Sequence, residues 1–221
     1  MSELSKTYQK KSEKEHILSN PDTYIGSVDT SESNVWVYDS SSSKILNKII
    51  LYNPGLFKLF DEGIVNCRDH VVRMKQKGGD PVTYIDVSIN KETGEITMVN
   101  DGNGIDVEIH PEHNIWIPEL IFAHLRTSTN YNKDEKKIVG GKNGFGSCLI
   151  LIWSTQAMIE TVDSIRKLKY TQSFSNNLEI VDKPKITKCS KKSYTKISFI
   201  PDYNRLGFKS GLTEDMINRV V

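Results

Sequence analysis

The sequence predicts an α/β domain that combines one long amphipathic helix with several strands. Between Leu56 and Gln76, apolar side chains recur at the period of a helix and fall on one side of it. Residues 84–89 and 95–99 alternate apolar and polar side chains around a turn, which is typical of a β-hairpin. A chain of 221 residues with 37% apolar content can bury one substantial core, so we expect one large domain. Further alternating segments predict strands at 157–161, 170–174 and 196–199.

The remaining segments are less regular. Residues 1 to about 16 are polar and lysine-rich, so we expect a loose tail or an arm that packs on another surface. Residues 20–22 (Asn-Pro-Asp) predict a turn, and the apolar segment 45–51 fits a strand or a helix. Residues 212–221 predict a helix capped at Thr213 that stops before it is complete. We therefore expect a fragment of a longer protein.

Composition excludes several classes of function. The 29 basic and 28 acidic residues give a formal charge of +1, so the chain as a whole has no electrostatic preference for nucleic acid or membranes. Cys67, Cys148 and Cys189 stand far apart and form neither a disulfide framework nor a zinc motif. The longest fully apolar run, 149–153, is too short to cross a bilayer, and the N-terminus lacks a signal peptide. We expect a soluble, intracellular protein.

The segment Gly140–Gly146 has four glycines in seven residues. Such a backbone can turn successive N–H groups toward one anion, and the apolar run that follows can begin a helix facing the same point. A phosphate cradle is therefore one interpretation. A plain hairpin or a mobile loop is the other.

On the predicted helix, Glu62, Asn66 and Asp69 are spaced by four and three residues, so their side chains share one face. A solvated helix face is the simplest explanation and stays open. Against it, Gly63 lies inside the helix at a cost of up to about 1 kcal/mol relative to alanine, which a close backbone approach would explain. Mg²⁺ prefers oxygen ligands and a carboxylate can polarise a water, so Asn66 and Glu62 suit those roles.

Two further segments are candidates for nucleotide recognition. Asp101 follows a predicted strand and precedes two glycines, so it could accept a hydrogen bond from an exocyclic amine while a flat ring lies on the backbone. An ordinary turn is the alternative. Residues 125–131 gather hydroxyl and amide side chains that could bond ribose and phosphate or merely cap a helix.

In this order, the segments around Glu62, Asp101, residues 127–130 and Gly140–Gly146 resemble the Bergerat ATP-binding fold of DNA gyrase, the Hsp90 chaperones, MutL and histidine kinases. Other segments look more specifically like the ATPase region of eukaryotic-type DNA topoisomerase II, and together the resemblance covers nearly the whole chain. These segments are residues 8–11, 15–18, 21–27, 36–39 and 134–137.

The resemblance implies a two-layer α/β sandwich of the Bergerat (GHKL) type, with a mixed, mostly antiparallel sheet and helices on one face. It implies an N-terminal arm (1–24) that straps a homodimer and an ATP-binding domain (25–221) truncated before a transducer domain. In the full-length enzyme, ATP binding and hydrolysis would close and reset a dimer gate so that one DNA duplex passes through a double-strand break in another. The expected location is the nucleus, or the host cytoplasm or virion for a viral member.

The resemblance also implies a role for each matching residue, with ATP and Mg²⁺ as cofactors. Glu62 would be the general base, Asn66 the magnesium ligand, and Asp69 a support of the pocket. Asp101 and Thr195 would bind the adenine, and Tyr8 would reach the nucleotide of the partner subunit. Contacts to ribose and phosphates, and the lid over the triphosphate, would come from Ser128, Thr129, Asn130, Lys142, Asn143, Gly144, Phe145 and Gly146.

Three residues depart from the topoisomerase II pattern. Asp101 stands where that family usually has asparagine, and His70 where asparagine is common, although His70 could equally be a surface residue. Cys148 replaces the lysine that the family directs at the terminal phosphate, which would weaken triphosphate binding or turnover. Such drift suggests a divergent branch, and large DNA viruses of eukaryotes are one place where such enzymes occur.

Three other functions remain open from the sequence. A nucleotide-dependent clamp would hold ATP with little turnover, and a Hsp90-like chaperone would hydrolyse ATP without stimulation by DNA. An unrelated α/β domain would not bind Mg²⁺-ATP at all.

Overall fold

The computed structural model describes residues 10–125, 145–208 and 212–220. Its helices are α2 (Glu13–Ser19), α3 (Pro21–Tyr24), α4 (Pro54–Lys77), α5 (Ile117–Ala123), α6 (Gly146–Ile152) and α7 (Glu214–Val220). Its strands are β1 (Ser31–Asp39), β2 (Lys44–Tyr52), β3 (Ile85–Ile89), β4 (Ile96–Asn100), β5 (Ser154–Asp163), β6 (Leu168–Ser175), β7 (Ile180–Val181), β8 (Lys185–Lys188) and β9 (Tyr194–Pro201).

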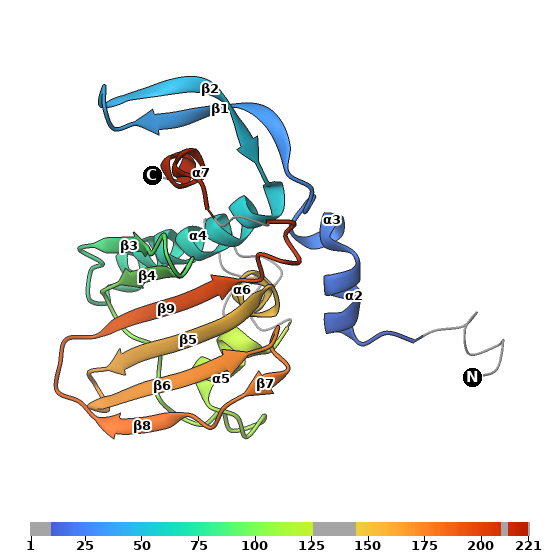
Figure 1. Ribbon diagram of the computed structural model, residues 1–221. Helices are drawn as coiled ribbons and strands as arrows, with labels where there is room; N and C mark the ends of the chain where they lie inside the picture. The colour runs from blue at the N-terminus through green and yellow to red at the C-terminus, as the bar shows by residue number, and fades with distance from the viewer. Residues whose placement is uncertain (1–9, 126–144, 209–211, 221) are drawn as a thin grey trace, which may run out of the picture.

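The main sheet has the strand order β3-β4-β9-β5-β6-β7, and β8 pairs with β6. All strand pairs within the described part of the chain are antiparallel. Helices α4, α5 and α6 cover the same face of this sheet (Figure 1). The predicted two-layer sandwich is therefore confirmed, as are the long helix, the β3–β4 hairpin and the three later strands.

Strand β4 alternates regularly between the two faces of the sheet. Ile96, Met98 and Asn100 point to the helix layer and are at most 5% exposed, while the residues between them are less buried. In the neighbouring strand β9, Phe199 lies opposite Ile96, and Thr195 lies opposite Asn100. Since cross-strand partners share a face, the apolar rows of both strands end in polar side chains at one edge of the core.

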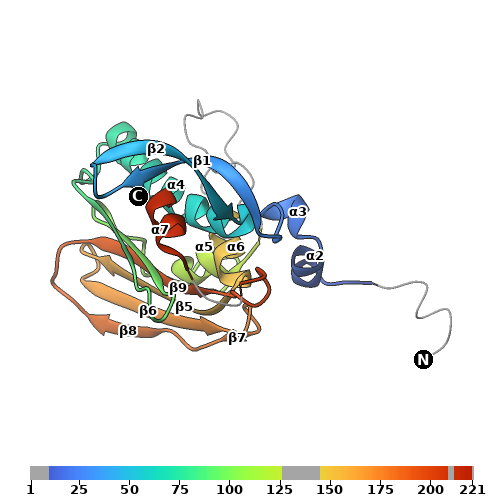
Figure 2. The same cartoon turned by 45° about the horizontal axis from the view of Figure 1, so that its top comes forward.

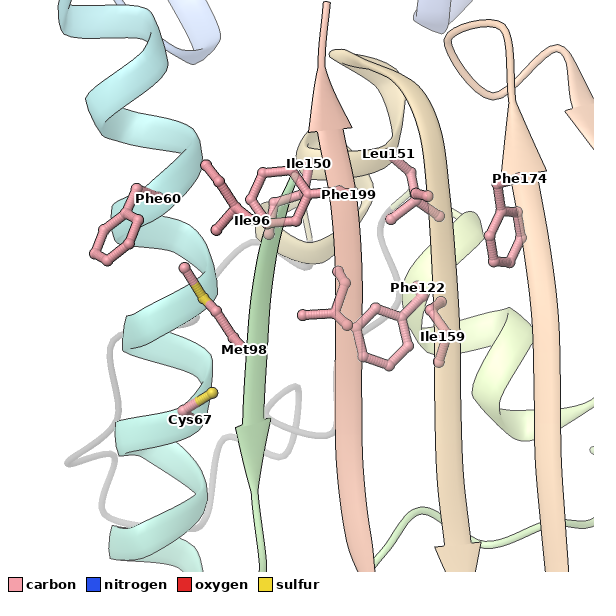
Figure 3. Packing of buried hydrophobic residues seen from close by; sticks show 12 residues of the cluster. Phe60, Cys67, Ile96, Met98, Phe122, Ile150, Leu151, Ile159, Phe174 and Phe199 are labelled. Atoms are coloured by element: carbon pink, nitrogen blue, oxygen red, sulfur yellow. The ribbon is translucent and has the colours of Figure 1, made fainter. Parts of the chain in front are cut away.

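Helix α4 packs closely on β4. Its first residue is Pro54, and Asn53 caps it by accepting a hydrogen bond from the Leu56 amide at 2.9 Å. A Cβ added at Gly63 would come within 2.5 Å of the Met98 sulfur, so a larger residue here would require the Met98 side chain or the helix to move. The close approach expected at Gly63 is therefore present, but a side chain, that of Met98, makes it. Figure 3 shows the main core between helix and sheet, which includes Phe60, Cys67, Ile96, Met98 and Phe199.

A second core forms where α2 docks beside α6. Ile17 of α2 is fully buried and packs in one cluster with Leu59 of α4, Trp153 and Leu206. Ser12 begins α2 with a reciprocal capping box in which Glu15 bonds the Ser12 amide. In the described part of residues 1–24, the chain therefore forms two helices, α2 and α3, and α2 packs on the domain. The boundary between arm and domain stays a prediction.

The β1–β2 hairpin is a separate two-stranded sheet, so the segment 45–51 is a strand. Helix α7 lies between this hairpin and α4 (Figures 1 and 2). The amide of Met216 donates to Oγ1 of Thr213 at 3.2 Å, which confirms the predicted cap. Among the helices that the structure describes, none is long and apolar enough to cross a membrane.

Candidate functional site

A cavity of about 380 Å³ lies between the helix layer and the ends of β4 and β9. Its volume is within the range of small-molecule sites, roughly 300–1,000 Å³. The described residues that line it come from α4, β4 with the following turn, α5, the beginning of α6, and β9. Its apolar wall includes Met98, Ile105, Ile117, Ile121, Phe122, Ile150 and Ile197, and its polar wall includes Glu62, Asn66, Asp69, His70, Arg73, Asn100, Asn103, Asp106, Ser147 and Thr195.

One face of α4 supplies the polar ridge of the cavity. Glu62, Asn66 and Asp69 all line it, as the sequence analysis expects, and Arg73 extends the ridge by one more turn. Asp69 is only 3% exposed, so the ridge is not a solvated helix face.

Glu62 lies at the end of the cavity where α6 begins. Its Oε1 is 2.7 Å from Nζ of Lys58. A Cβ on Gly146 would collide with its Oε2, so the glycine at the beginning of α6 leaves space for this carboxylate. The segment that enters α6 and the acid on α4 therefore meet at one point.

Asn66 lies one turn further along the cavity. Its Nδ2 donates to Oγ of Ser147 on α6 at 3.2 Å, so the amide oxygen is the end that could coordinate a cation. Among the described residues, no group of three His, Cys, Asp or Glu side chains is arranged to hold a metal ion. A magnesium ion here would depend on an amide oxygen together with oxygens of a bound ligand, a donor set that Mg²⁺ accepts.

The far end of the ridge carries Arg73 and His70, whose side chains are half-buried. Nε of Arg73 is buried and has no partner within the described part of the chain; burial lowers the pKa of Arg73, although Asp69 opposes the shift. Burial, and then the charge of Arg73, lower the pKa of His70. His70 lines the cavity and is therefore not a surface residue.

Asn100 and Thr195 stand side by side in the sheet at the base of the cavity. Nδ2 of Asn100 donates to the backbone oxygen of Asp101 at 2.9 Å, so Oδ1 is the atom that can accept from a ligand. The hydroxyl of Thr195 lies 3.2 Å from that of Thr161, which also bonds the Ile105 amide. This pair combines an acceptor and a hydroxyl beside an apolar wall.

Asp101 does not line the cavity. Its fully buried carboxylate accepts from the amides of Thr83 and Tyr84, from the Thr83 hydroxyl, and from Nζ of Lys192 at 2.8 Å. Burial alone would raise the pKa of this carboxyl, but Lys192 and the bonds from Thr83 and Tyr84 outweigh it and hold the pKa far below its usual range. Asp101 therefore fixes the entry to β3 and the loop before β9.

The other sequence-predicted residues have three different outcomes. Gly146 lines the cavity, whereas Phe145 packs its ring edge-on against Tyr24, 6.4 Å between centroids. Cys148 is 1% exposed in the second core, and burial raises the pKa of its thiol to about 12. Seven residues lie outside the described part of the chain: Tyr8, Ser128, Thr129, Asn130, Lys142, Asn143 and Gly144.

Asn100 and Arg73 are among the cavity-lining residues that the sequence patterns did not single out. Both had a signal in the pattern. Asn100 is in phase with Ile96 and Met98 along the strand, and Arg73 follows Asp69 by four residues on the same helix.

A helix layer on one face of an antiparallel sheet, with a polar ridge and a sheet end enclosing a cavity, is the arrangement of GHKL ATPase domains. The 43K ATPase domain of Thermus thermophilus gyrase B matches with a TM-score of 0.61 over 92% of this chain and 43% of that one; at 19% identity, this likeness shows the fold alone.

Closer relatives identify the family, although no family model matches the sequence. A protein of Acanthamoeba polyphaga mimivirus named DNA topoisomerase 2 is 49% identical over 210 residues, 93% of this chain and 16% of that protein. The crystal structure of the ATPase region of Saccharomyces cerevisiae topoisomerase II matches with a TM-score of 0.92 and 47% identity, over 98% of this chain and 56% of that one. By sequence and fold, the chain belongs to the DNA topoisomerase II family.

The chain spans only part of these relatives, 16% of the mimivirus protein. It matches the ATPase region of the yeast protein. Since viral and yeast proteins are similarly close to it, a viral origin stays a prediction.

Proposed function

We propose that this chain binds ATP in the cavity beside α4 and hydrolyses it, as the ATPase part of a type IIA DNA topoisomerase. The observation that carries this proposal is a convergence: Glu62 and Asn66 of α4, Gly146 of α6, and the sheet residues Asn100 and Thr195 line one cavity. Groups suited to phosphates and groups suited to a purine thus share one site.

The adenine would bind at the sheet end of the cavity. We assign the acceptor for its exocyclic amine to Asn100 rather than Asp101, because the carboxylate of Asp101 is fully engaged outside the cavity. The hydroxyl of Thr195 would bond near the same ring, and the apolar side chains of α5 would cover its faces.

The triphosphate would extend along α4 toward the beginning of α6. Glu62 would take a proton from the attacking water, and Asn66 would contribute an amide oxygen to Mg²⁺. When bound, Mg²⁺ supplies charge stabilisation to the phosphate oxygens. Asp69 would support the ridge between these groups and the adenine. Nε of Arg73 is buried without a hydrogen-bond partner in the described part of the chain, so Arg73 is suited to a polar part of the nucleotide. The roles expected of Tyr8, residues 128–130 and residues 142–145 remain part of the proposal.

Replacement of the general base tests this function directly. Glu62→Ala in the full-length protein should lower kcat for ATP hydrolysis by roughly 10²- to 10⁴-fold, the usual contribution of a general base, while the Kd for a non-hydrolysable analogue changes little. Asp61→Asn is the matched control, since Asp61 is the adjacent acid on α4 and does not line the cavity. Unchanged turnover in Glu62→Ala would remove Glu62 from this role.

In the whole enzyme, ATP binding would close a homodimer gate and drive the passage of one DNA duplex through another. A clamp that holds ATP with little turnover is the second candidate, because Cys148 is a buried neutral thiol where the family has a phosphate-directed lysine. ATPase assays with and without duplex DNA separate the two: a topoisomerase should be stimulated by DNA, and a clamp should bind the analogue without measurable turnover.

A further inference from the structure

The two carboxylate oxygens of Glu62 have different neighbours. Oε1 lies 2.7 Å from Nζ of Lys58, one turn earlier on α4. Oε2 faces Gly146, so closely that any side chain at this position would overlap it. One oxygen is held by a cation, and the other is turned toward the point where the chain enters α6.

We propose that Lys58 is a positioning residue for the general base: it holds Oε1 of Glu62 so that Oε2 receives the proton, while Gly146 leaves Oε2 uncovered. In this step, Oε2 takes a proton from water as the water oxygen bonds to the γ-phosphorus and the bond from phosphorus to the β–γ bridging oxygen breaks. The inference rests on the proposed function, because it states how Glu62 is oriented for that reaction.

Lys58 is suited to this role by its charge and its place. Partial burial alone would lower the pKa of Lys58, but the hydrogen bonds to Glu62 and Asp61 outweigh it and raise the pKa, so the ammonium stays charged. Lys58 does not line the cavity. It can therefore act on the reaction through Glu62 without a contact to the nucleotide.

Asp61 provides an internal comparison. Its Oδ2 lies 3.0 Å from the same ammonium, so Lys58 bridges two neighbouring acids of α4. Only Glu62 of the two lines the cavity. If the ammonium matters only as a partner in a helix salt bridge, losing either acid contact should have similar consequences, whereas a positioning role makes the Glu62 contact the important one.

The pair contributes little to folding, because both side chains are partly exposed, 39% for Lys58 and 21% for Glu62. An effect on the rate would therefore come from orientation. Displacement of a reacting group by the order of 1 Å can cost about 10²-fold in rate.

The experiment measures steady-state ATP hydrolysis and the Kd of a non-hydrolysable ATP analogue in the full-length protein. Lys58→Met should lower kcat about 10- to 100-fold and leave Kd within about twofold, since an interaction needed only for the reaction changes kcat and not binding. Lys58→Arg, which keeps the charge, should recover most of the loss, and Asp61→Asn should retain the wild-type kcat. Gly146→Ala should lower kcat, because its methyl group would displace Oε2 from this position.

Each result decides between the two proposals. If Glu62→Ala abolishes hydrolysis but Lys58→Met keeps the wild-type kcat, the positioning role is wrong and the proposed function stands. If Glu62→Ala retains hydrolysis, the proposed function itself is wrong. A rise in Kd with an unchanged kcat in Lys58→Met would make Lys58 a binding residue and overturn the inference. Thermal unfolding checks the fold of each variant, and Lys58→Gln replaces Lys58→Met if the latter is unfolded.

Discussion

Asn100 and Asp101 are adjacent in the chain but serve opposite sides of the end of β4. Asn100 points into the cavity beside Thr195, and its amide is anchored by one bond to the backbone of Asp101. Asp101 turns away from the cavity and is bonded by Thr83, Tyr84 and Lys192. One side chain is left with an acceptor for a ligand, and the other is saturated by the protein.

The difference between Asn100 and Asp101 follows from the strand, in which successive side chains point to opposite faces of the sheet. Residues that continue the phase of the buried row reach the cavity, and the next residue does not, whatever its chemistry. A carboxylate is the better acceptor in isolation, yet here it stabilises the fold while a neutral amide faces the site.

The largest effect that separates the two residues should be on stability. Asp101→Asn replaces a buried acceptor of four hydrogen bonds by a group with one acceptor atom, so we expect a loss of about 2 kcal/mol in the free energy of unfolding at pH 7. For a chain of this length the melting temperature should fall by about 4–8 °C. Calorimetry measures this change, and nucleotide affinity should be nearly unchanged. If Asp101→Asn instead kept its stability and lost most of its nucleotide affinity, Asp101 would serve binding rather than the fold.

This stability difference should depend on pH. Because the folded-state pKa of Asp101 is lowered, its contribution is complete above the unfolded-state pKa of about 3.9 and is lost as the pH falls below that value. Denaturation of the wild type and Asp101→Asn should therefore differ most near neutral pH and converge in acid. If the difference in unfolding free energy between the wild type and Asp101→Asn stayed constant down to pH 3, the lowered pKa of Asp101 would be contradicted.

Asn100→Ala should act on binding. Loss of the acceptor for the adenine amine should raise the Kd for an ATP analogue by about 10-fold, corresponding to about 1–1.5 kcal/mol for one hydrogen bond. Isothermal titration calorimetry with ATP and GTP analogues tests this assignment, because the loss should be confined to the adenine nucleotide. Equal weakening of both would mean that Asn100 does not read the base.

The smallest effect is expected at Lys192, the cation beside Asp101. Its side chain is 64% exposed, so Lys192→Met should cost less than about 1 kcal/mol of stability, the range of solvated ion pairs. The bonds from Thr83 and Tyr84 would still hold the carboxylate. Urea denaturation measures this difference, and a loss as large as that in Asp101→Asn would mean that the ion pair dominates the site.

Most of the fold could be predicted from local patterns. The apolar period of α4 and the alternation of β3, β4, β5, β6 and β9 follow directly from side-chain burial. The segment 45–51 was ambiguous because its outer face is apolar: Ile45 and Ile49 are 67% and 70% exposed, which hides the alternation of β2. Helix α2 was missed because it buries mainly one side chain, Ile17, and its stability depends on contacts with α4 and α6.

The site was predicted less completely than the fold. The spacing of Glu62, Asn66 and Asp69 was sufficient, because all three share one helix face. The choice of Asp101 followed the chemistry of a carboxylate next to glycines, while the direction of the side chain depends on where β4 ends. The burial of Cys148 could not be predicted, because it depends on packing against α2, which is distant in the sequence.

The contact between Gly63 and Met98 has a consequence for the size of ligand that the protein can accept. Because Gly63 has no Cβ, Met98 of the strand that ends in Asn100 lies directly against the helix that carries Glu62. An alanine at position 63 would push the Met98 side chain aside or move α4 away from β4. Either movement would change the width of the cavity, because Gly63 and Met98 both line it.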